Sequence, residues 1–143
     1  LARAMARRAA EHRSSVNSGY GALAEYVAAR SSDTEGGPRQ HLRAWADRRL
    51  PEIMAERLAI AGVLREMAGA APGLSGALEG AAGGYEAVAG LGRELREKLM
   101  GLTAAAPDGE AAAETGWTEA AGLVRQMHET EEQALQQVAA AGR

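Results

Sequence analysis

The chain has 143 residues, of which 46% are apolar, and its formal net charge is −3. This length suits one domain spanning residues 1–143, and the weakly acidic balance gives no basis for nucleic-acid binding. The absence of cysteine excludes disulfides, thiolate metal sites and cysteine nucleophiles, and no apolar run approaches the roughly 20 residues that cross a bilayer. Phenylalanine is also absent, so we predict a core of small and aliphatic side chains.

The first predicted helix runs from about residue 2 to residue 30. Its apolar and small residues recur at spacings of three and four, which is typical of a helix that packs along one side. This series consists of Met5, Ala9, His12, Val16, Gly19, Leu23 and Tyr26 or Val27. A serine- and glycine-rich segment over residues 31–37 then predicts a loop.

The second predicted helix begins at Pro38 and continues to about Gly69. Pro38 suits a first helical turn, because the backbone N–H that proline lacks is not needed there. Pro51 lies inside the helix, where it removes a hydrogen bond and crowds the preceding turn, so we expect a kink or two abutting helices at this place. The inward positions are Leu42, Trp45 or Ala46, Leu50, Ile53, Arg57, Ile60, Leu64 and Met67.

Two more helices are predicted over residues 75–102 and 110–140. The inward series of the former is Leu74, Leu78, Ala81, Tyr85, Val88, Gly92, Leu95, Leu99 and Leu102. The inward series of the latter is Ala113, Trp117, Ala120, Val124, Met127, Glu131, Leu135 and Val138. Four long helices joined by short connections favour an all-α, antiparallel, up-down-up-down four-helix bundle with both termini at one end.

The few inward polar residues are predicted to share one height in this bundle. Counting from the expected helix ends places a layer that consists of His12, Glu56, Arg57, Tyr85, His128 and Glu131. In one interpretation the layer is structural: Arg57 pairs with Glu131, and Tyr85 donates to a carboxylate. In another it is a pocket for a small anion, because arginine binds carboxylates and phosphates through two parallel N–H groups.

A metal–carboxylate site is a further alternative. His128 shares one helical face with Glu131 and Glu132, and Glu56 lies on the second predicted helix. The pair His128 and Glu132 resembles the His-x-x-x-Glu element in the last helix of hemerythrin-like bundles. However, ferritin-like sites need Glu-x-x-His on two helices, and three histidines are too few for a hemerythrin-type centre. We therefore expect no metal and no other cofactor.

Enzymatic chemistry finds little support in this sequence. The pair Gly83 and Gly84 lies inside a helical pattern rather than in a phosphate-binding loop after a strand. The serines near His12 have no aspartate placed to complete a catalytic triad. We therefore predict a non-enzymatic protein.

In its predicted architecture the whole chain resembles the helical-bundle ligand-binding domains of bacterial chemoreceptors and sensor kinases. The features that carry the resemblance are the long antiparallel bundle, the termini at one end, the absence of cysteine and the polar layer around Arg57 and Glu131. The resemblance implies an extracytoplasmic, often homodimeric module that is tethered by membrane helices outside this chain. It also implies a small ligand bound between the helices.

A partner-binding or scaffold bundle is the alternative function. In such a protein an exposed apolar stripe on one helix would contact the partner.

Overall fold

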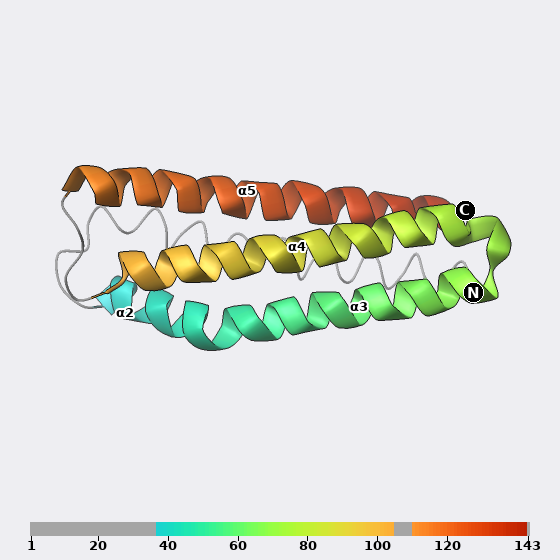
Figure 1. The fold of residues 1–143 in the computed structure, drawn as a ribbon, viewed down its shortest axis with the longest axis horizontal. Helices are drawn as coiled ribbons and strands as arrows, with labels where there is room; N and C mark the ends of the chain where they lie inside the picture. The colour runs from blue at the N-terminus through green and yellow to red at the C-terminus, as the bar shows by residue number, and fades with distance from the viewer. Residues whose placement is uncertain (1–36, 105–109, 143) are drawn as a thin grey trace.

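The computed structural model describes residues 37–104 and 110–142, and every regular element within these ranges is a helix. The elements are α2 (Gly37–Ala44), a π-helical turn (Trp45–Arg49), α3 (Leu50–Ala70), a 3-10 turn (Pro72–Leu74), α4 (Ser75–Leu102) and α5 (Glu110–Ala141). Figure 1 shows α3, α4 and α5 as three long rods lying side by side. The prediction of an all-α protein is confirmed for this part of the chain. The helix predicted over residues 2–30, with His12, lies outside the described residues.

The helix predicted over residues 38–69 is interrupted just before Pro51. Here the N–H of Leu50 donates to the carbonyl of Trp45, five residues earlier, which is the hydrogen bond of a π-helix. Two causes favour this wider turn. Pro51 cannot continue the regular hydrogen-bond ladder, and the buried residues Leu42, Ala46 and Leu50 follow one another in steps of four, slightly more than one α-helical turn.

α4 is the central element of the described fold. It packs along its length against both α3 and α5, whereas α3 and α5 scarcely contact one another. The buried residues of α4 repeat at helical spacing because one side faces both neighbours. They are Leu78, Ala81, Ala82, Tyr85, Val88, Ala89, Gly92, Leu95 and Leu99. These include the predicted inward series except its end residues, Leu74 and Leu102, which are partly buried.

The core consists of two apolar clusters. One lies toward the turn between α3 and α4, and its buried members are Ala61, Leu64, Ala68, Leu78, Ala81, Ala82, Tyr85, Ala134, Leu135 and Val138. The other lies toward α2, and its buried members are Leu42, Ala46, Leu50, Val88, Leu95, Leu99, Trp117, Ala120, Val124 and Met127. Along α3 and α5, the two clusters are separated by buried charged residues.

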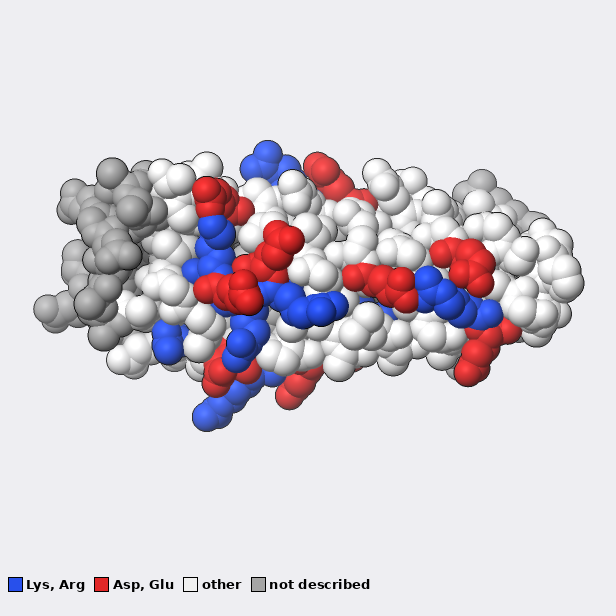
Figure 2. Space-filling model, viewed as in Figure 1, with Lys and Arg blue, Asp and Glu red and all other residues white. Residues whose placement is uncertain are grey.

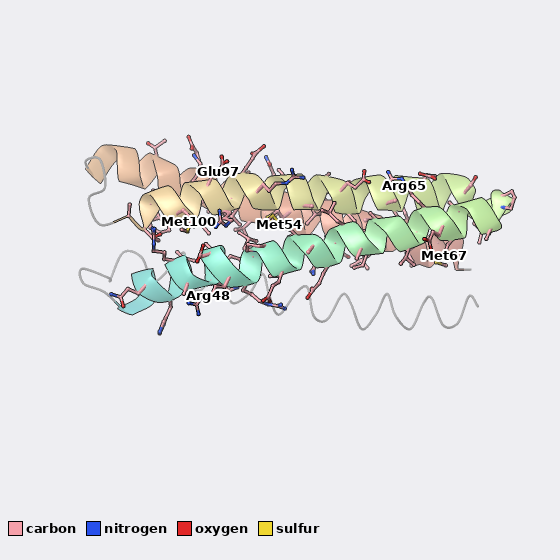
Figure 3. The ribbon with its side chains drawn as sticks, turned by 60° about the horizontal axis from the view of Figure 1, so that its bottom comes forward. Arg48, Met54, Arg65, Met67, Glu97 and Met100 are labelled. Atoms are coloured by element: carbon pink, nitrogen blue, oxygen red, sulfur yellow. The ribbon has the colours of Figure 1, made fainter. Side chains whose placement is uncertain are left out.

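Charged side chains tie the helices together at the surface. Arg65 reaches from α3 across to α4, where it pairs with Glu79 and Glu86 (Figure 3). Near the other end, Asp47 of the π-helical turn pairs with Arg96 of α4 at 2.9 Å. Figure 2 shows basic and acidic side chains next to one another on this face of the molecule. Such exposed pairs are worth roughly 0–1 kcal/mol each, so burial must supply most of the stability.

Over residues 37–104 and 110–142, no helix combines the length and the apolar character of a membrane span.

Candidate functional site

The site is built around an ion pair between α3 and α5. Nε of Arg57 donates to Oε1 of Glu131 at 2.7 Å, which is the pairing of the structural interpretation of this layer. Arg57 is 6% exposed and Glu131 is 0% exposed, so this pair is one of the few charged contacts inside the fold. Burying two charges costs several kcal/mol per ion, and the attraction within the pair offsets this cost only when the geometry is good. The main effect of the pair is therefore to fix the height of α3 relative to α5, and its net contribution to the stability of the fold is small.

A chain of charges connects this pair with the surface. Glu56 accepts a hydrogen bond from Nη1 of Arg57 at 3.2 Å, and its other oxygen lies 3.5 Å from Nη1 of Arg49. The side chains of Glu56 and Arg49 are about half exposed. Nη2 of Arg57 makes no hydrogen bond to the described residues. The guanidinium therefore keeps one donor group for a further acceptor.

Tyr85 of α4 belongs to the same layer. It is 2% exposed, and the pKa of its phenol is raised, first by burial and then by the negative charge of Glu131, while Arg57 acts in the opposite direction. The influence of both charges on its phenol places Tyr85 of α4 near the Arg57–Glu131 pair. The hydrogen bond expected from Tyr85 to a carboxylate stays a prediction.

Tyr85 is expected to make the protein sensitive to alkaline pH. Its pKa is about 10 when unfolded and higher when folded, so the folded state retains the proton. The contribution of protonated Tyr85 to the free energy of unfolding is therefore fully present below about pH 10 and falls as the pH rises above that value. Between pH 8 and pH 11 the parent should lose about 1 kcal/mol more unfolding free energy than Tyr85→Phe. Urea unfolding at both pH values measures this difference, and equal losses in the two proteins would contradict it.

The remaining predicted residues lie around this layer or outside it. His128 and Glu132 are partly buried on α5, within one turn of Glu131. Glu56 lies at the rim, where it contacts Arg49 and Arg57. No group of three or more histidine, aspartate or glutamate residues in the described part of the chain is arranged to hold a metal ion. Glu131, one of the residues of the metal alternative, forms its hydrogen bond with Arg57.

Sequence reasoning missed Arg49, which connects this pair with the surface. The sequence did indicate it, because Arg49 of the π-helical turn and Glu52 and Glu56 of α3 follow one another at spacings of three and four. Such spacing places opposite charges next to each other on a helix. Arg49 donates to Glu52 at 3.0 Å, and this hydrogen bond is the largest of the influences that raise the pKa of Arg49.

Comparisons with known proteins add nothing to this geometry, so the interpretation of the site depends on the geometry alone. No protein-family model, no curated protein and no solved structure matches the chain.

Proposed function

We propose that the chain is a non-enzymatic helical-bundle ligand-binding domain of the kind that bacterial transmembrane chemoreceptors and sensor kinases use. The observation that supports this is the buried charged pair of Arg57 and Glu131 between the two apolar clusters, with Tyr85 of the first cluster near it. A purely apolar core would be at least as stable, since replacing buried ion pairs with packed apolar residues is often neutral or stabilising. The layer therefore suggests a role in recognition.

The proposed ligand is a small anion such as a carboxylate. Nη2 of Arg57 is the donor group that remains for it, and His128 of α5 and His12 are further donors in this proposal. A negative charge bound at Arg57 weakens the attraction between Arg57 and Glu131. Because these residues lie on α3 and α5, binding is coupled to a displacement of one helix against the other.

The proposal includes a fourth helix formed by residues 2–30. α3 and α5 each pack on α4 but scarcely on each other, so the proposal places this helix opposite α4, against both of them. The small and apolar series in residues 2–30 provides a matching face. The bundle would then be antiparallel and up-down-up-down, with membrane segments outside this chain and an extracytoplasmic location.

The test is a thermal-unfolding screen of the protein with single small carboxylates, amino acids and inorganic phosphate. A ligand present at 100 times its dissociation constant is expected to add about 2.7 kcal/mol of stability. Arg57→Lys should abolish the shift, because lysine keeps the charge but not the planar set of donors. Arg49→Lys is the matched control at the surface and should retain it. If no anion of the panel shifts the midpoint in the parent, the ligand proposal is wrong.

A partner-binding bundle is the second candidate, and a different observation favours it. Leu58 and Val63 are 45% and 54% exposed on α3, and they are the large apolar residues that the described surface exposes most. Exposed apolar groups of this kind on a helix are used for contacts with other proteins.

A further inference from the structure

The outer face of α3 carries small and apolar residues at helical spacing. While the opposite face packs on the core, this face exposes Ala55, Leu58, Ala59, Gly62 and Val63, together with Glu52 near its start. A helix that is apolar on both sides is normally covered on both. Alanine and glycine along the middle of the face allow the backbone of another helix to approach closely. The outer face of α3 is therefore suited to pack against a helix.

Two charged residues frame this face. Arg48 precedes it and Glu66 follows it, 18 residues further along the chain. Eighteen residues make about five α-helical turns, slightly fewer across the π-helical turn that contains Arg48, so the two side chains leave the helix on roughly the same side and about 27 Å apart. Both are exposed, and neither forms a hydrogen bond or an ion pair with the described residues. In Figure 3, Arg48 lies on the side of its helix that faces away from α4.

We propose that this face binds a second copy of the chain, with the two α3 helices antiparallel. The axis of two-fold symmetry then passes at the level of Arg57. Arg48 of each copy faces Glu66 of the partner, so two ion pairs flank the contact. Ala55 of one copy faces Ala59 of the other near the axis, and Leu58 and Val63 become covered.

The charge pattern selects the antiparallel orientation. In a parallel pair, Arg48 would face Arg48 and Glu66 would face Glu66, and like charges across an interface are strongly unfavourable. In the antiparallel pair, every such contact joins opposite charges. The contact area is one helix face, so the expected dimer is weak and depends on concentration.

This dimer goes beyond the proposed sensor function and is independent of the ligand site, because Arg57 points to the opposite side of α3. It also differs from a dimer of two domains standing on one membrane. In an antiparallel pair the equivalent ends of the two bundles point in opposite directions, so this pair cannot form between two copies anchored in one membrane through the same ends.

Charge reversal tests the ion pairs. Sedimentation equilibrium over a concentration series should show a monomer–dimer equilibrium for the parent. Arg48→Glu and Glu66→Arg should each raise the dissociation constant about tenfold or more, and the double variant should restore the parent value. Arg125→Glu, an exposed charge on α5, is the matched control and should leave association unchanged. If the parent stays monomeric over the whole concentration series, the proposal is wrong. The face would then be covered by another part of the chain or bind another protein.

Cross-linking tests the orientation, because the chain has no cysteine of its own. Glu52→Cys and Gly62→Cys place thiols about 15 Å apart on the outer face. In the antiparallel dimer, residue 52 of one copy faces residue 62 of the other. Oxidation should therefore give disulfide dimers only when the two variants are mixed. Dimers formed by each variant alone would show a parallel pair and overturn the proposal, while leaving the sensor function open.

Discussion

Replacing Arg57 with methionine is expected to lower the free energy of unfolding by about 3–5 kcal/mol at pH 7. The change removes the cation that bonds to Glu131 at 2.7 Å, and Glu131 is fully buried. Burial removes the carboxylate from water at a cost in free energy, and without the arginine this cost is no longer offset. Methionine has a similar length, so the loss of charge dominates over any cavity.

Arg49→Met is the matched control for this experiment. Arg49 is also on the α3 side of the fold and also pairs with glutamates, but its side chain is 51% exposed. Its removal is expected to cost less than about 1 kcal/mol. Urea denaturation of both variants measures the comparison. Similar costs for the two arginines would show that the buried pair has no special role in stability.

The double variant Arg57→Met/Glu131→Leu should recover much of the lost stability at pH 7.

Replacing Gly84 with valine is expected to lower the free energy of unfolding by about 3 kcal/mol. A Cβ atom at Gly84 would lie 2.9 Å from Cβ of Ala134 and 3.7 Å from the carbonyl oxygen of Thr130, both on α5. Neither atom can rotate away, because one is fixed to the backbone and the other belongs to it. The two helices would have to separate along the buried seam.

Gly84→Ala and Gly62→Ala form the critical comparison. Alanine is better than glycine in a helix interior by about 1 kcal/mol. A Cβ at Gly62 meets no atom within 4 Å, so Gly62→Ala should stabilise the protein by about 0.5–1 kcal/mol. Gly84→Ala should destabilise it by about 1 kcal/mol, because the contact with Ala134 outweighs the helix preference. Equal stabilisation by both changes, measured by thermal unfolding, would contradict the close approach of α4 and α5.

Much of the candidate site could be predicted because its members lie on regular helices. Arg57 and Glu131 interrupt apolar series with three- and four-residue spacing, so the sequence alone indicated that both point inward. Equal distances from the helix ends then placed them at one height, and their hydrogen bond confirms this placement. Glu56 was less predictable, because its neighbour Arg57 turns inward while Glu56 stays at the rim. His12 stays a prediction, since it lies outside the described residues.

The sequence by itself determined the all-helical character of residues 37–104 and 110–142, the bounds of α4 and the buried side of each long helix. These properties follow from local spacing, because a residue's angle around a helix depends only on its neighbours in the chain. Only the tertiary structure decided that Pro51 is preceded by a π-helical turn and that Gly84 but not Gly62 is in close contact with a neighbouring helix. These properties depend on the distance and relative height of neighbouring helices. Both are set by how complete side chains fit together across the interface, which no spacing within a single helix specifies.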